Sequence, residues 1–358
     1  MRLLDAWIGM VVAACSADNT GIPDLGPRPP AAPTALGERP SAQVKPIAEA
    51  INPRVLRRFK PIEPLRADTS ATGRLRIQLG KQLFFDKRLS QQGDIACATC
   101  HPLDHGGTDG LATSRGSRGK LGKRNAPTVF NAAWHVAQFW DGRAHTSEEQ
   151  ARSPLLDPDE MAAHNPEEVT AKLRAIRGYV HALSEAFPAD KTPVDFDHAI
   201  AAIVAFERTL ITPSRWDRYL RGERDALTEA ELDGLKLFAD VGCVQCHTGE
   251  LLGGSMFQRV GVAQPWPNQT DLGRFALTHD TNDRMVFKVP SLRNVAVTPP
   301  YFHDGSTGSL AEAVRMMAQY QLDTELTPEE VASIVTWLKT LTGVPPADAI
   351  TPPELPPG

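Results

Sequence analysis

Two copies of the pattern Cys-x-x-Cys-His are the part of the sequence best suited to chemistry. They are Cys97-Ala-Thr-Cys100-His101 and Cys243-Val-Gln-Cys246-His247. Two thiols about one helical turn apart can add to the two vinyl groups of a haem, and the adjacent histidine then lies under the iron. We therefore predict two covalently bound c-type haems, with His101 and His247 as proximal iron ligands.

Two other chemistries use similar cysteine patterns. A redox-active dithiol needs Cys-x-x-Cys but not the histidine that follows it. A zinc site would have to combine ligands from two motifs that are far apart in the chain. Both alternatives explain less of the pattern than haem attachment does.

The fifth cysteine, Cys15, belongs to a different context. It follows Val11-Val12-Ala13-Ala14, and residues 1–15 also contain an early Arg2 and a short apolar stretch. This arrangement is typical of an export signal, and Val-Ala-Ala-Cys resembles a bacterial lipoprotein processing site. We expect a periplasmic protein, with Cys15 as a lipidated anchor to a membrane. An ordinary signal peptide is the alternative, since Asp5 interrupts the apolar stretch.

Composition divides the rest of the chain into segments. Residues 16–50 are rich in proline and alanine and predict a flexible tether, and residues 344–358 predict a loose proline-rich tail. The net charge of −5 leaves no basic footprint for nucleic acid. No apolar run approaches the ~20 residues that cross a bilayer, which excludes an integral membrane protein.

The central part of the chain repeats itself. A glycine-to-aspartate segment precedes each haem motif, and two further segments follow each motif in the same order. Such collinear similarity predicts two related haem domains in tandem, at residues 51–212 and 213–343. The paired segments are Gly80–Asp86 with Gly234–Asp240, Pro127–Asn131 with Pro290–Asn294, and Trp140–Gly142 with His303–Gly305.

The connecting segments have helical patterns. Apolar residues recur at helical spacing over His198–Leu210, and strand-like alternation is scarce. We predict a mostly α fold built of two tandem class I cytochrome c-like haem domains with long connecting loops. Four helix starts are indicated by capping residues: Asn165-Pro166…Glu168, Thr228…Glu231, Ser309…Glu312 and Thr327-Pro328…Glu330.

A methionine follows the second haem motif at a position suited to iron ligation. Met317 shares a helical face with Leu310, Ala313 and Val314, whereas Met316 falls about 100° away. A methionine as second axial ligand raises the potential of a haem and makes it an electron carrier. We predict that Met317 ligates the second iron; packing in the core is the alternative.

In the first half, the comparable region carries a carboxylate. The segment Leu155-Leu-Asp-Pro-Asp-Glu160-Met161 places Glu160 where it could move a proton between the oxygens of a bound peroxide. A solvated loop acid is the alternative for Glu160. Met161 could instead ligate the first iron and close that site.

With these motifs together, the sequence strongly resembles the bacterial dihaem cytochrome c peroxidases over residues 70–343. The segments that carry the resemblance are Leu79-Gly-Lys-Gln-Leu-Phe-Phe-Asp-Lys-Arg-Leu-Ser90, Arg124-Asn-Ala-Pro-Thr128, Gln138-Phe-Trp-Asp-Gly-Arg143, Phe206-Glu-Arg-Thr-Leu210, Pro290-Ser-Leu-Arg-Asn294 and Pro300-Tyr-Phe-His-Asp-Gly305.

The resemblance implies different functions for the two haems. The haem on His101 would be peroxidatic, and the haem held by His247 and Met317 would have a high potential. Glu160 and Gln150 would flank the peroxide pocket.

Further residues gain roles only through the same resemblance. Phe139 would lie near the peroxide pocket, and Trp140 would stand between the haems on the electron path. Asn125, Thr298 and Pro300 would hold a calcium ion at the domain interface through carbonyl and side-chain oxygens, a donor set that calcium accepts.

The activity implied by the resemblance is the reduction of hydrogen peroxide to water. The electron donor would be a small periplasmic cytochrome c or a copper protein of the cupredoxin type, and members of the family are often homodimers. Two alternatives stay open: a dihaem enzyme that oxidises another protein during its maturation, and a non-catalytic dihaem electron carrier. The protein-oxidising relative uses tyrosine on its second haem, whereas Met317 fits here.

One segment departs from the family pattern. Many members carry a histidine before the Arg-Asn-Ala-Pro-Thr motif that caps the peroxidatic iron until reduction releases it. Ser117 stands at that position here, and the loop of residues 113–124 contains no histidine or methionine. We predict that this haem is five-coordinate at rest, with His105 as an alternative cap.

Overall fold

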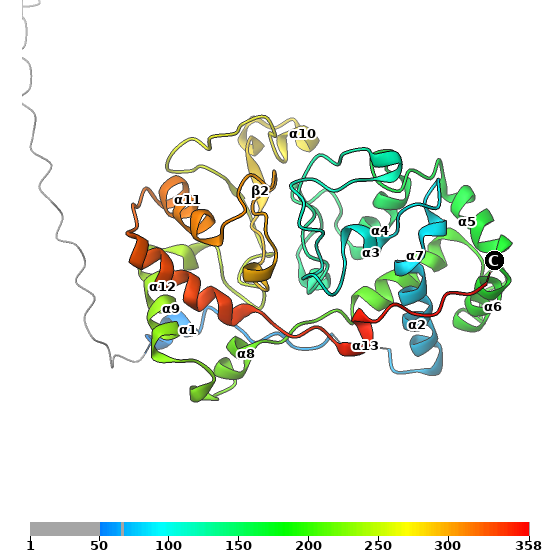
Figure 1. The fold of residues 1–358 in the computed structure, drawn as a ribbon, viewed down its shortest axis with the longest axis horizontal. Helices are drawn as coiled ribbons and strands as arrows, with labels where there is room; N and C mark the ends of the chain where they lie inside the picture. The colour runs from blue at the N-terminus through cyan, green and yellow to red at the C-terminus, as the bar shows by residue number, and fades with distance from the viewer. Residues whose placement is uncertain (1–50, 66–67, 358) are drawn as a thin grey trace, which may run out of the picture. The chain divides into compact units, whose positions relative to one another are not determined.

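Two groups of helices, each with one Cys-x-x-Cys-His motif, form most of the folded chain (Figure 1). The computed structural model describes residues 51–65 and 68–357. The predicted export signal at residues 1–15, with Cys15, and the predicted tether at residues 16–50 lie outside the described residues.

The first group contains the helices before residue 212. It comprises α2 to α7, and α1 precedes it in the chain. Their bounds are α1 Pro53–Leu56, α2 Ala71–Phe85, α3 Cys97–Cys100, α4 Ser147–Leu156, α5 Pro166–Ala175, α6 Arg177–Ala186 and α7 Phe196–Glu207.

The second group contains α8 to α12 and one short antiparallel sheet, in which Gln258 pairs with Phe287, and α13 follows this group in the chain. Helices therefore dominate the described part of the chain, which confirms the mostly α prediction. The bounds are α8 Arg215–Leu220, α9 Glu229–Val241, β1 Phe257–Arg259, α10 Phe275–Thr278, β2 Val286–Lys288, α11 Leu310–Leu322, α12 Pro328–Leu338 and α13 Ala347–Ile350.

Side-chain caps begin the long helices where the sequence predicts. Thr228 and Thr327 form reciprocal capping boxes with the glutamates three residues later. Ser309 and Asn165 accept hydrogen bonds from the backbone of the corresponding glutamates. Each such cap satisfies backbone N–H groups that have no partner within the helix. The four predicted helix starts are confirmed.

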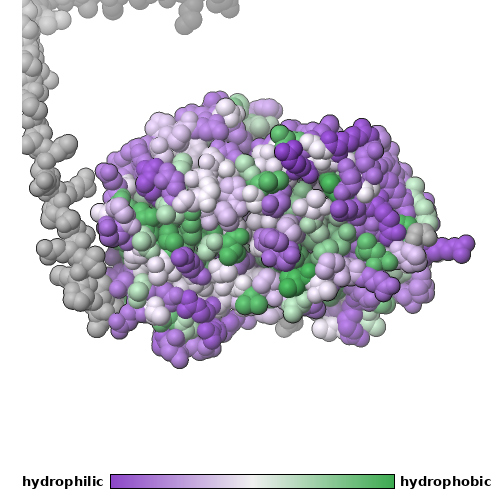
Figure 2. Space-filling model, in the orientation of Figure 1, coloured by the Kyte–Doolittle hydropathy of each residue, from purple (hydrophilic) through white to green (hydrophobic). Residues whose placement is uncertain are grey.

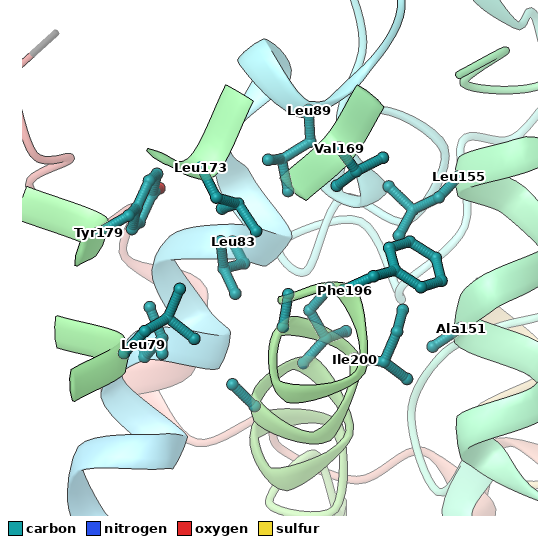
Figure 3. Packing of buried hydrophobic residues seen from close by; sticks show 14 of the residues in the cluster. Leu79, Leu83, Leu89, Ala151, Leu155, Val169, Leu173, Tyr179, Phe196 and Ile200 are labelled. Atoms are coloured by element: carbon teal, nitrogen blue, oxygen red, sulfur yellow. The ribbon is translucent and has the colours of Figure 1, made fainter. Parts of the chain in front are cut away.

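The first hydrophobic core lies between α2 and α7, with α5 and α6 closing it. Leu79 and Leu83 of α2 point toward Ile200 of α7, and Leu173 and Val169 of α5 complete the cluster (Figure 3). Burying each of these large apolar side chains stabilises the fold by about 1.5–3 kcal/mol. This core holds α2 in place next to the first haem motif.

A glycine of the internal repeat sets a close helix crossing in each half. A Cβ atom on Gly80 of α2 would lie 1.8 Å from the carbonyl oxygen of Ala202 in α7. A Cβ atom on Gly234 of α9 would lie 2.1 Å from the carbonyl oxygen of Ser333 in α12. The repeated segment before each haem motif therefore makes the same contact twice.

A second repeated residue joins the two halves. Asn131 and Asn294 occupy equivalent places, and both adopt the left-handed conformation with φ of 62° and 61°. Their side-chain amides donate to the same hydroxyl, that of Thr212, at 2.8 and 2.9 Å. Thr212 thus lies where the two repeats meet, next to the predicted domain boundary.

The second core contains α9 and α12 together with the first described residues of the chain. Phe59 packs edge to face on Trp216, with ring centroids 5.3 Å apart. The backbone N–H of Ile62 donates to the Asp217 carboxylate at 2.7 Å. Residues 51–62 therefore pack with the second half, although the sequence analysis grouped them with the first. Their aromatic and apolar side chains complete the core around Trp216.

The proline-rich C-terminal segment lies against the first half. Ala349 of α13 is buried against the cluster that contains Phe84 and Phe206. The Gln82 side chain donates to the carbonyl of Glu354 at 3.0 Å. The prediction of a loose tail is wrong for residues 344–357, because this segment covers apolar side chains of α2 and α7.

The surface of the described chain carries mixed side chains. On the face in Figure 2, hydrophilic residues predominate along the rim and hydrophobic ones gather toward the middle. Within residues 51–65 and 68–357, no helix combines the length and the apolar character that crossing a membrane requires.

Candidate active site

Both haem motifs present their histidine in the orientation that iron ligation needs. The Nδ1 of His101 donates to the carbonyl of Gly107 at 3.1 Å. The Nδ1 of His247 donates to the carbonyl of Leu252 at 2.8 Å. Such second-shell hydrogen bonds fix the ring and leave Nε2 as the ligand atom. The four cysteines of the two motifs form no disulfide with one another.

The thiols have the opposite character to a redox dithiol. Burial raises the pKa of Cys100 to about 11 and that of Cys243 to about 12. Reactive dithiols need a lowered thiol pKa. Among the described residues, no group of three or more His, Cys, Asp or Glu side chains converges as a metal site. Haem attachment remains the chemistry that the motifs fit.

A large cavity surrounds the second motif. Its wall contains Cys243, Cys246 and His247 on one side and Met317 on α11. The rest of the wall near α11 and α12 is apolar, with Leu310, Ala313, Val314, Ile334 and Leu338. An apolar cavity with two thiols, an oriented imidazole and a thioether fits a c-type haem with two axial ligands.

Met317 and Met316 differ as the periodicity predicts. Met317 lines the cavity with His247, whereas Met316 is absent from its wall. Both methionines also contact the small cluster formed by Trp266, Met285 and Phe287, so the cavity wall alone separates them. The structure thus brings Met317, and not Met316, to the site of the second haem.

Glu160 lies close to the first haem motif. Burial, with a contribution from the Asp157 charge, raises the pKa of its carboxyl to about 7. Its own charge contributes to the raised pKa of both Cys97 and Cys100, after burial. A carboxyl in this environment is not a solvated loop acid, and its pKa suits a group that both accepts and returns a proton near neutral pH.

Arg143 interacts with both Phe139 and Glu160. The guanidinium carbon of Arg143 lies 3.4 Å from the centroid of the Phe139 ring. Its positive charge partly offsets the rise in the pKa of Glu160 caused by burial. Arg143 is not among the site residues predicted from the sequence, although it ends one of the segments that carry the family resemblance.

Gln150 and Met161 lie on either side of Glu160 in the chain, in different environments. Gln150 is a half-buried residue of α4, the helix that leads into the turn containing Glu160. Met161 is 3% exposed and belongs to the first hydrophobic core. Its burial there argues against the alternative in which Met161 ligates the first iron.

The loop of residues 113–124 is held against the turn that carries Glu160. The Ser117 hydroxyl donates to the Asp94 carboxylate at 2.9 Å. The Ser117 backbone N–H donates to the Glu160 carbonyl at 2.7 Å. His105, the alternative cap, is an exposed residue whose ring contacts Asp104 at 2.9 Å.

The residues expected at the interface of the two halves do come together. Trp140 lines the cavity of the second motif together with Asn125, Thr298 and Pro300. Phe139, which was expected near the peroxide pocket of the first haem, also lines this cavity. The Trp140 indole donates to the Asn125 carbonyl at 2.9 Å. The oxygens that Asn125, Thr298 and Pro300 offer are neutral amide, hydroxyl and carbonyl oxygens.

Comparison with known proteins is consistent with this geometry. The family model described as di-haem cytochrome c peroxidase matches residues 74–225. Cytochrome c551 peroxidase of Nitrosomonas europaea is 45% identical over 80% of this chain and 85% of its own length. The chain belongs to the di-haem cytochrome c peroxidase family.

Other members of the di-haem cytochrome c peroxidase family match nearly the whole chain. Cytochrome c551 peroxidase of Pseudomonas aeruginosa is 42% identical over 87% of this chain and 88% of its own. Methylamine utilization protein MauG of Methylorubrum extorquens is 33% identical over 99% and 98%. The crystal structure of a MauG-like protein associated with microbial copper homeostasis superposes with a TM-score of 0.69 at 34% identity, covering 82% of this chain and 95% of that one.

Membership of the di-haem cytochrome c peroxidase family makes the protein a haem-dependent peroxidase with two c-type haems. Glu207, a second half-buried acid, lies near Cys97 of the first haem motif in this peroxidase. Burial and the Glu148 charge raise the pKa of Glu207 to about 8, and its charge contributes to the raised pKa of Cys97. Sequence analysis missed it because a glutamate at the end of a helix is normally solvated.

Proposed function

We propose that this peroxidase reduces hydrogen peroxide to water at the haem on His101. Electrons would enter one at a time through the haem held by His247 and Met317. The donor would be a small periplasmic cytochrome c or a cupredoxin. The observation that carries the proposal is Glu160, a half-buried residue beside the first haem motif whose carboxyl has a pKa raised to about 7.

The chain's own residues move the protons of this reaction. When bound, a c-type haem with one open face supplies the iron at which the peroxide O–O bond breaks. The Glu160 carboxylate would accept a proton from one oxygen of hydrogen peroxide and return it to the other oxygen, which leaves as water. Gln150 and Phe139 would position the peroxide. The Arg143 guanidinium keeps the Glu160 carboxyl able to ionise near neutral pH.

Electron transfer between the haems would run through Trp140. This residue lies in the wall of the second cavity and is fixed by its hydrogen bond to the Asn125 carbonyl. Calcium held by Asn125, Thr298 and Pro300 would fix the backbone at Asn125, whose carbonyl accepts the hydrogen bond of Trp140. The two halves predicted at residues 51–212 and 213–343 would each act as a class I cytochrome c-like domain, with residues 51–62 completing the core of the second one. The repeated glycine crossings support two similar domains.

We further propose that the first haem is five-coordinate at rest and needs no reductive activation. The hydroxyl of Ser117 donates a hydrogen bond to the Asp94 carboxylate, so the loop of residues 113–124 would present no ligand to the iron. Electron paramagnetic resonance of the resting ferric enzyme tests this. We expect one high-spin and one low-spin haem, and a spectrum with low-spin signals alone would contradict the proposal.

The turnover assay separates this function from its alternatives. We expect steady consumption of hydrogen peroxide with a reduced small cytochrome c, and binding of cyanide by one haem. A protein-oxidising maturation enzyme would turn over slowly with that donor. An electron carrier with two capped irons would bind cyanide poorly. Export to the periplasm, lipidation at Cys15 and assembly as a homodimer complete the proposal for the full chain.

A further inference from the structure

A buried lysine and a half-buried histidine form a pair in the wall of the second cavity. Lys288 ends β2 and is 6% exposed. Its ammonium contacts Nδ1 of His135, which follows the turn Ala132–Trp134 in the first half of the chain. Both side chains line the cavity that also contains His247 and Met317.

The pair carries a positive charge without an acidic partner. Among the described residues, no carboxylate lies within 4 Å of the Lys288 ammonium. Burial lowers the pKa of Lys288 to about 8. An unpaired ammonium in such a place costs several kcal/mol, so buried charges are normally paired.

The other buried cations nearby already have counter-charges. Arg293, which also lines the cavity, forms a fully buried ion pair with Asp217 at 2.8 Å. Arg124 pairs with Asp141 and Asp271, both at 2.6 Å. Lys288 therefore differs from these arginines in facing the cavity without a carboxylate.

The geometry also sets the protonation of His135. Burial and the Lys288 charge hold the pKa of His135 well below its ordinary value, so the ring is neutral. Because Nδ1 accepts from the ammonium, the ring proton is on Nε2. The pair thus offers N–H donors of both residues and one positive charge, a combination that binds a carboxylate.

We propose that Lys288 and His135 bind a propionate carboxylate of the haem attached to Cys243 and Cys246. This inference rests on the proposed ligation of that haem by His247. The pair would neutralise the propionate and stabilise the reduced iron. The backbone N–H of Lys288 donates to the Trp140 carbonyl at 2.7 Å, so the counter-charge is fixed beside the proposed electron path.

The test is the reduction potential of the methionine-ligated haem, measured by spectroelectrochemistry on the holoenzyme. In Lys288→Met the propionate loses its counter-charge, and we expect a more negative potential. Lys288→Arg keeps the charge, so its potential should lie close to that of the wild-type enzyme. The control is Lys60→Met, which removes a 70% exposed lysine of the same half. A potential in Lys288→Met that matches the control would overturn the proposal.

A second measurement covers the case in which Lys288→Met fails to fold. Redox-difference infrared spectra of enzyme with haem ¹³C-labelled at the propionates should show a labelled carboxylate band that moves in Lys288→Arg and in His135→Gln. Labelled bands identical in wild type and both variants would refute the contact. A wild-type absorption spectrum without a second, methionine-ligated haem would instead overturn the ligand assignment on which the pair depends.

Discussion

Trp140 and His303 occupy equivalent positions in the two repeats, and their rings meet edge to face with centroids 6.4 Å apart. Both line the cavity of the second haem motif. His303 is 3% exposed and stacks on Phe287 at 4.1 Å, and its Nε2 has no hydrogen-bond partner among the described residues. The two halves therefore meet through one residue of each repeat, next to where an electron would cross.

Replacing Trp140 should slow transfer between the haems. Trp140→Phe keeps a ring but loses the N–H that donates to the Asn125 carbonyl. We expect slower oxidation of the second haem when pre-reduced enzyme meets peroxide in a stopped-flow experiment. Trp134→Phe is the control, because the Trp134 indole N–H has no such partner in the described chain. Equal rates in both variants would remove Trp140 from the path.

Glu160 should control the pH dependence of peroxide turnover. Its pKa is raised to about 7, and the carboxylate form is needed to accept a proton. We therefore expect kcat/KM for peroxide to fall as the pH drops through about 7. In Glu160→Gln this acid limb of the pH profile should disappear, and kcat/KM for peroxide should fall by about 10²–10⁴-fold. Glu167→Gln, an exposed acid on α5, should retain both the limb and the rate.

Arg143 should set where this limb lies. Its charge lowers the pKa of Glu160 against the larger effect of burial. Arg143→Gln should therefore move the acid limb to higher pH, whereas Arg143→Lys should leave it near the wild-type position. The pH profile of kcat/KM measures both. A limb that stays in place in Arg143→Gln would show that the two side chains do not interact.

Gly80 should tolerate no side chain. A Cβ atom there would lie 1.8 Å from a backbone carbonyl of α7, which cannot move without separating the two helices. Gly80→Ala should lower the free energy of unfolding by about 1–3 kcal/mol or more. Chemical denaturation measures this effect. Gly308→Ala, where nothing lies within 4 Å, should change stability by less than about 0.5 kcal/mol.

Local patterns were sufficient to predict several features. Capping residues such as Thr228 and Thr327 act on backbone groups a few positions away, so their helix starts could be predicted without tertiary information. The helical period separated Met317 from Met316 for the same reason. The tail at residues 344–357 could not be predicted, because its partners on α2 lie far away in the chain.

The sequence by itself determined the chemistry of attachment: two Cys-x-x-Cys-His motifs, a methionine in phase with the second, and a repeat that implies two similar halves. Only the tertiary structure decided how these groups behave. Burial raises the pKa of Glu160, and the fold places the Arg143 charge close enough to offset part of that rise. The fold also places Lys288 beside a histidine and away from any described carboxylate. Desolvation and charge depend on which segments pack together in space, and residue types along the chain do not specify them.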